Sequence, residues 1–120
     1  MKRIEVLDKA IEERARDVRA IGINPTLLGA YSTSLKVGND KINFQEVIWD
    51  DEIKEIAAAL KEYGVCEFTI SSNYSGLIAT LSAFQKYGFQ MAGLTEVKAG
   101  YHDIITDDYA KLPAIRMMNI

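Results

Sequence analysis

The segment from residue 65 to residue 97 constrains the fold most, because its pattern changes from strand to helix and back to strand. Residues 65–71 alternate apolar and polar side chains from Cys66 onward and are rich in strand-forming residue types. An amphipathic helix is predicted next, ending at Gly88, and residues 89–97 carry a second strand pattern. The side chains expected to face the core are Cys66, Phe68 and Ile70 in the first strand and Leu77, Ile78, Leu81 and Phe84 in the helix. If both strands lie in one sheet, they form a βαβ unit, whose strands are expected to be parallel with a right-handed crossover.

The N-terminal part of the chain is predicted to be helical. Apolar residues at helical spacing indicate an amphipathic helix over residues 3–20, which Gly22 ends. Asn24 and Pro25 mark the start of a second helix, because an Asn side chain can accept a hydrogen bond from a free amide and Pro fits the first turn without losing one. This helix is expected to end at Gly38. Its buried stripe is predicted to consist of Leu27, Leu28, Tyr31 and Leu35.

Two further regions complete the set of predicted elements. Residues 39–49 fit neither the helical nor the strand period, so a short strand and an ordered loop are both compatible with them. Asp50 is predicted to be the N-cap of a helix over residues 51–63, with Ile53, Ile56, Ala57 and Leu60 as its inner stripe. Residues 114–120 are a strand candidate that could fold back on residues 94–105 through a turn at 106–108.

These elements predict one α/β (α+β) domain over residues 1–120. We expect two layers, with a mixed sheet of three to four strands that contains one βαβ unit, and about four helices. The helical part, residues 1–38, is expected to pack on the α/β part, residues 44–120. A chain of 120 residues with 48% hydrophobic and 26% charged residues has the size and composition of one globular domain.

The charge balance excludes some partners. Seventeen acidic and fourteen basic residues give a net charge of -3, whereas nucleic-acid-binding domains are usually basic, so we expect no nucleic-acid partner. Residues 39–64 contain seven acidic residues and three lysines, which predicts an acidic patch around the middle helix. No apolar leader or run of membrane-spanning length occurs, so we expect no membrane partner and no export. Cys66 is the only cysteine and is expected to be buried, which fits a reducing cytoplasm.

One candidate partner-binding surface lies at the start of the middle helix. It consists of Trp49, Asp50, Asp51, Glu52 and Glu55. Trp49 is the only tryptophan, a residue type enriched in binding hot spots, although it is more often part of a core. The acidic residues could also act as a pair in general acid–base catalysis, bind a hard cation, or only stabilise the helix N-terminus. Their spacing does not match a calcium loop, so we expect no metal.

A second candidate site is the turn after the first predicted strand. Ser72, Asn73, Tyr74 and Ser75 lead into a helix N-terminus, whose free amides can bind a ligand or anion. Ser and Asn are also typical of plain helix caps. A nucleotide phosphate would normally need a glycine-rich loop, and Gly76 stands alone. His102 and Asp103 are adjacent and would point to opposite faces of a strand, so no catalytic residues are predicted.

The sequence has two resemblances to known families. Residues 68–71, Asn73 and residues 85–89 (QKYGF) resemble the late strand, Asn-containing helix start and helix end of the acyl-CoA-dependent N-acetyltransferase superfamily. Those enzymes cradle a pyrophosphate with a glycine-rich loop that this chain lacks, so no cofactor is expected. The segments 22–26, 38–40, 44–50, 67–72, 91–97 and 112–117 carry the other resemblance. They are similar to an uncharacterised family of small proteins from Gram-positive gut bacteria, their phages and integrative elements, a family without an assigned activity.

The function expected from these observations is that of a non-enzymatic protein-interaction protein with an unknown protein partner. The second resemblance suggests a mobile-element accessory protein or an anti-defence inhibitor. One alternative is a small acyl-CoA or small-molecule enzyme distantly like the N-acetyltransferases. Another is a self-associating structural module, in which a sheet edge or the tail from Met117 to Ile120 pairs with a second copy in a homodimer.

Overall fold

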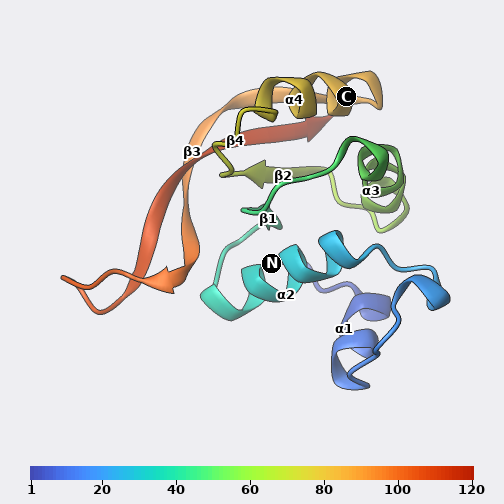
Figure 1. Ribbon diagram of the computed structural model, residues 1–120, viewed down its shortest axis with the longest axis horizontal. Coiled ribbons are helices and arrows are strands. Elements are labelled where there is room, and N and C mark those ends of the chain that lie inside the picture. Colours follow the sequence, from blue (N-terminus) through green and yellow to red (C-terminus); the bar gives the residue numbers. More distant parts are fainter.

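A computed structural model describes all 120 residues of the chain. It contains four α-helices, one short 3-10 helix (η1) and four strands (Figure 1). The helices are α1 (Glu5–Glu12), η1 (Arg19–Ile21), α2 (Pro25–Val37), α3 (Asp50–Glu62) and α4 (Leu77–Lys86). The strands are β1 (Asn43–Phe44), β2 (Glu67–Ile70), β3 (Phe89–His102) and β4 (Tyr109–Asn119).

The four strands form one mixed sheet in the order β1-β2-β4-β3. β1 pairs with β2 in parallel, and β4 pairs antiparallel with both β2 and β3. Since β4 runs opposite to both of its neighbours, β2 and β3 run parallel to each other, as predicted. They are not adjacent, because β4 lies between them. The predicted βαβ unit is therefore a split βαβ unit, in which another strand separates the two parallel strands. The predicted α+β fold class with a mixed sheet of four strands is confirmed.

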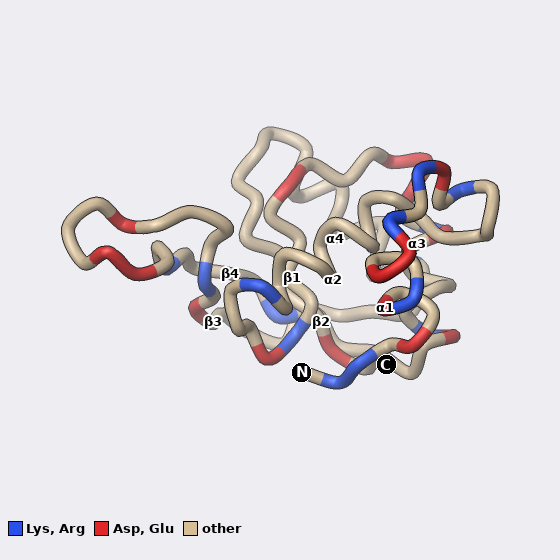
Figure 2. Tube along the Cα trace, turned by 90° about the horizontal axis from the view of Figure 1, so that it is seen from below, with Lys and Arg blue, Asp and Glu red and all other residues tan.

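The last two strands form a long hairpin. Their pairing runs from Phe89 opposite Asn119 to His102 opposite Tyr109, so the C-terminal segment does fold back on the preceding strand. Residues 114–119 pair with residues 89–95 rather than with the predicted segment 94–105, because β4 already begins at Tyr109. A bulge between Met91 and Leu94 contains Gly93 at φ +110°, a conformation that residues with a Cβ rarely adopt. The distal end of the hairpin projects from the body of the molecule in two perpendicular views (Figures 1 and 2).

The hydrophobic core is continuous through both parts of the chain. Phe68 of β2 lies at its centre, with ring centroids 5.0 Å from Phe84, 5.1 Å from Phe89 and 5.5 Å from Phe44. The same cluster of buried side chains reaches Leu7 of α1 and several side chains of α2. The N-terminal helices therefore share one core with the sheet.

The start and end of α2 follow the predicted capping chemistry. The Asn24 side chain accepts a hydrogen bond from the Leu27 amide at 3.0 Å, and Pro25 is the first helical residue. Gly38 ends the helix in the left-handed conformation, with φ +80°. Of the predicted stripe, Leu27 and Tyr31 are fully buried while Leu28 and Leu35 are partly buried. The region that follows is a two-residue strand, β1, within an ordered loop.

The first helix is shorter than predicted. α1 ends at Glu12, and Arg14 adopts φ +50° where the chain turns away. The segment 12–17 contains only Ala15 as an apolar residue, so little buried surface is available to stabilise another helical turn. The prediction of a helix over residues 3–20 was wrong for this reason.

Two predicted core residues are also exposed. Cys66 precedes the first residue of β2, so the alternation of the strand does not include it, and its thiol is exposed. Ile78 is 82% exposed. It lies about 200° around α4 from Thr80, which is buried on the same face as Phe84. The predicted inner stripe of this helix was therefore wrong at Ile78.

Tyr31 joins α1 to α2 within the core. Its hydroxyl donates a hydrogen bond to Asp8 Oδ1 (2.7 Å) and accepts one from the Ile4 amide (3.0 Å). Arg3 also donates to Asp8, at 2.9 Å. The hydrogen bonds from Arg3 and Tyr31 hold the pKa of the Asp8 carboxyl below its usual value. Burial raises the pKa of the Tyr31 phenol.

Asp8→Asn is expected to reduce the sensitivity of the fold to acid. The pKa of Asp8 is lower in the folded chain than the ordinary value of 3.8, so the carboxylate stabilises the fold above that pH. This contribution is lost as the pH falls through the lower folded value. Urea unfolding at pH 7 and pH 3 should show a smaller loss of stability for Asp8→Asn than for the natural chain. Asp51→Asn, at an exposed position, is the control, and equal losses in all three proteins would contradict this account.

Candidate functional site

The predicted partner surface at the start of α3 is only partly exposed. Trp49 is 68% exposed. It occupies the N-cap position of α3, which begins at Asp50, so the prediction of Asp50 as N-cap was wrong by one residue. The Trp49 amide donates to Glu52 Oε2 at 3.4 Å, which places the capping function on Glu52. Asp50 and Asp51 are exposed beside Trp49.

Glu52 and Glu55 are bound to other parts of the chain. Glu52 is 7% exposed, its Oε1 accepts a hydrogen bond from the Thr26 hydroxyl at 2.8 Å, and it lies 3.5 Å from Arg19. Glu55 pairs with the same Arg19 at 3.4 Å. Of the five predicted residues, the structure therefore leaves Trp49, Asp50 and Asp51 free at the surface.

The turn between β2 and α4 holds a neighbouring loop. Ser72 is buried, and its hydroxyl lies 2.6 Å from the Gln45 carbonyl oxygen and 2.8 Å from that of Glu46. The Tyr74 hydroxyl donates to the Ile48 carbonyl at 3.2 Å and also contacts the Thr80 hydroxyl. This turn therefore lies against the loop that leads to Trp49.

The turn does not cap α4 as expected. Gly76 is the N-cap of that helix, and no side chain bonds its free amides. Asn73 and Ser75 are exposed, whereas the polar groups of Ser72 and Tyr74 are used within the fold. The capping interpretation of Ser72 to Ser75 was wrong, because two of these side chains bond the neighbouring loop instead.

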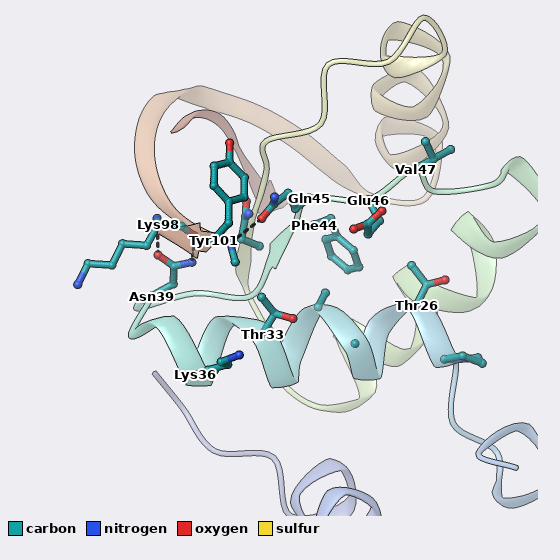
Figure 3. Close-up of a pocket in the computed structure, with 15 residues that line it drawn as sticks. Thr26, Thr33, Lys36, Asn39, Phe44, Gln45, Glu46, Val47, Lys98 and Tyr101 are labelled. Carbon is teal, nitrogen blue, oxygen red and sulfur yellow. Dashed lines mark hydrogen bonds between the residues drawn. The ribbon is translucent and has the colours of Figure 1, made fainter. Parts of the chain in front are cut away.

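A groove of about 530 Å³ lies between α2 and the distal part of β3 (Figure 3). This volume is within the range of ligand-binding pockets. One wall is a helical stripe of α2, and the other segments are residues 43–47 and 98–101. The residues of α2 that line the groove are Pro25, Thr26, Gly29, Ala30, Thr33 and Lys36.

Side-chain amides fix the distance between the walls. The Asn39 side chain donates to the Lys98 carbonyl at 3.0 Å and accepts from the Lys98 amide at 2.9 Å. The Gly100 amide donates to Gln45 Oε1 at 3.1 Å. Asn39 and Gln45 flank β1, and β1 and β3 are the two edge strands, so the sheet curls until its opposite edges meet at this groove. This arrangement depends on contacts between residues more than 50 positions apart, and local sequence patterns carry no signal for it.

The groove has charges that the fold does not pair. Lys36 and Lys98 have no carboxylate within 4.0 Å, and Glu46 has no basic group within that distance, unlike the residues in the six ion pairs of the molecule. Lys36 lies near the end of the groove at Asn39, and Glu46 lies toward Thr26 (Figure 3). The Lys98 backbone bonds Asn39 at this end, while the Lys98 side chain points away from the groove. The groove thus has a basic end and an acidic end.

Gly29 is a helical residue that the fold itself does not require. A Cβ added there would have no atom within 4 Å outside its own helix, and its φ is not positive. A glycine inside a helix is less favourable than alanine by roughly 0.5–1 kcal/mol. The chain therefore carries this destabilising residue at a position where its only structural effect is to expose the backbone of α2 to the groove.

The tip of the β3–β4 hairpin presents two isoleucines to solvent. Ile104 is 99% exposed and Ile105 is 92% exposed. The tip is ordered by hydrogen bonds from the Asp103 amide to the Asp108 carbonyl (2.7 Å) and from the Ile105 amide to Asp103 Oδ1 (2.8 Å). Sequence reasoning missed this feature, although two adjacent isoleucines inside a polar turn were a visible signal.

The comparison with protein families covers most of these features. A family model described as a domain of unknown function, DUF7698, matches residues 26–119. The chain belongs to the DUF7698 family. The DUF7698 match contains all four strands, the groove apart from Pro25, the hairpin tip and the start of α3, and leaves out α1 and η1. The uncharacterised nature of the family, expected from the sequence, is thereby confirmed.

The DUF7698 chain has no further relative among curated proteins or solved structures and no cluster of metal-binding side chains. No curated protein matches it, and neither does any solved structure. None of its helices has both the length and the apolar character needed to cross a bilayer. No group of three or more His, Cys, Asp or Glu side chains is arranged as a metal site.

Proposed function

We propose that this DUF7698 chain is a non-enzymatic protein-interaction protein that contacts its partner through the tip of the β3–β4 hairpin. The observation that carries this proposal is the exposure of Ile104 and Ile105 at the end of a projecting, hydrogen-bonded arm. Burial of one isoleucine side chain contributes about 1.5–3 kcal/mol. Because the tip is already ordered, little of that free energy is lost to ordering on binding.

The charges of the tip define the chemistry of the partner. Asp103, Asp107 and Asp108 surround the two isoleucines, and acidic segments mark this arm in Figure 2. An apolar pocket bordered by Lys and Arg residues would complement such a tip. Trp49 with Asp50 and Asp51 has the same combination of an exposed apolar side chain and acidic groups, which supports a second contact of the same kind.

The setting of this function is part of the proposal. The sequence resemblance to proteins of Gram-positive gut bacteria, phages and integrative elements supports a role as a mobile-element accessory protein or an anti-defence inhibitor. The target would then be a host protein. The exposed thiol of Cys66 is consistent with a reducing cytoplasmic location.

The double variant Ile104→Ser/Ile105→Ser is expected to weaken partner binding by about 100-fold or more, because two buried side chains are lost. The partner would be trapped with a photoreactive amino acid at position 105 in phage-challenged Gram-positive cells, then purified and measured by calorimetry. Ile78→Ser, which changes an isoleucine that is 82% exposed elsewhere, is the matched control and should bind normally. The stability of both variants should stay within about 0.5 kcal/mol of the natural chain.

Two results would overturn this assignment. Equal affinity of the double variant and the natural chain would show that the tip does not contact the partner. Cross-linking to a second copy of the chain, with a dimer in light scattering that the double variant abolishes, would instead establish the self-associating module.

A further inference from the structure

We propose that the groove between α2 and β3 binds the C-terminal end of another protein chain as an extended peptide of about five residues. Its free carboxylate would lie at the end of the groove where Lys36 stands. α2 advances about 16 Å from Pro25 to Lys36, at about 1.5 Å per residue. An extended peptide advances about 3.3 Å per residue, so about five residues span the groove.

Gly29 indicates that the occupant lies directly against the helix. The absence of a side chain there leaves the backbone of α2 open to the groove, and nothing else in the protein uses the space. Close approach of a ligand to the backbone is a recognised reason for a glycine that folding does not need. The neighbouring Ala30 and Thr33 continue the same shallow wall.

The unpaired charges orient the peptide. Lys36 supplies positive charge for a terminal carboxylate, and Glu46 toward the other end supplies negative charge for a Lys or Arg at the first of the five residues. The backbone amides of Glu46 and Val47 form no hydrogen bond within the chain and can donate to an extended peptide backbone.

Residues 119 and 120 are held away from the groove and do not occupy it. The Ile120 amide donates to the Gly88 carbonyl at 2.9 Å, which fixes the end of the chain where β3 begins. The groove lies at the opposite end of β3, at residues 98–101. The inference also does not depend on the hairpin tip, which is a separate surface.

The test uses the chain of 120 residues and a pool of pentapeptides with Arg first, mixed residues at the other positions and a free carboxylate. We expect saturable NMR shifts of the Gly29, Ala30 and Gly100 amides, and at least tenfold weaker binding of the amidated pool and of a pool with Glu first. Gly29→Met should abolish binding while raising the melting temperature, which separates blockage from unfolding. Lys36→Glu should weaken binding at least tenfold, whereas Lys54→Glu, an exposed charge reversal on α3, should not.

Several outcomes would overturn this inference. They are the absence of shifts at millimolar peptide, equal binding of free and amidated pools, and unchanged binding by Gly29→Met. Shifts of the same amides with acetyl-CoA but not with peptide would make the groove a small-molecule site instead. Ile104→Ser/Ile105→Ser should retain peptide binding, so failure of the hairpin proposal and failure of the groove proposal are distinguishable.

Discussion

Replacing Phe68 with alanine is expected to lower the free energy of unfolding by about 3–5 kcal/mol. The ring is fully buried and contacts three other rings, Phe44, Phe84 and Phe89, which come from β1, α4 and β3. Its removal leaves a cavity that several elements would have to close together. Because small domains are stable by only about 5–15 kcal/mol, this one change takes a large part of the total.

Urea unfolding followed by circular dichroism measures this effect. Phe68→Leu keeps most of the side-chain volume and should cost about 1–2 kcal/mol. Leu94→Ala, at an exposed position of β3, is the surface control and should stay within about 0.5 kcal/mol of the natural chain. A loss below about 1 kcal/mol for Phe68→Ala would show that this cluster of four rings is not the centre of the core.

The parts of the fold that local chemistry determines could be predicted from the sequence. The caps of α2 at Asn24 and Gly38 depend on residues within one helical turn, and both are in place. The strand, helix and strand from residue 65 to residue 97 have clear periods. The position of β4 between β2 and β3 depends on pairing between strands that are distant in the sequence, and the hydrophobic period of each separate strand does not determine this pairing.

The candidate sites were harder to predict, because exposure and side-chain partners depend on distant residues. Ser72 has the residue type of a helix cap, but its hydroxyl, like that of Tyr74, bonds the loop 45–48, which lies more than 20 positions earlier. The groove forms only because Asn39 and Gln45 meet β3. Gly29 gave a local signal, since a glycine inside a helical pattern needs a reason, yet that reason became visible only with the groove.

Glu52 is the clearest case of a side chain whose partners could not be predicted from its sequence neighbours. Its sequence neighbours Trp49, Asp50 and Asp51 suggested a shared surface, but its position on the first turn of α3 directs it toward Thr26 and Arg19. An acidic residue three positions after an N-cap is as typical of a helix start as of a binding site. The contacts decide between these two roles, and they connect α3 with α2 and η1.

Glu52→Ala is therefore expected to lower the free energy of unfolding by about 2 kcal/mol. Most of this loss comes from the hydrogen bond of the Thr26 hydroxyl to the buried carboxylate, since a bond to a charged group contributes about 1.5–3 kcal/mol. The bond from the Trp49 amide is 3.4 Å long and contributes less. The ion pair adds little, because the Arg19 side chain is half-exposed and its charge stays hydrated.

Thermal and urea unfolding of Glu52→Ala, Glu52→Gln and Asp51→Ala measure this contribution. Glu52→Gln retains an oxygen that can accept a hydrogen bond, so it should lose less stability than Glu52→Ala. Asp51→Ala changes an exposed neighbour on the same turn and should lose little. If Glu52→Ala were as stable as the natural chain but bound the partner more weakly, Glu52 would be a contact residue of the Trp49 surface. We expect a less stable protein whose folded fraction binds normally. This result would assign Glu52 to the contacts of α3 with α2 and η1, and would leave Trp49, Asp50 and Asp51 as the exposed surface.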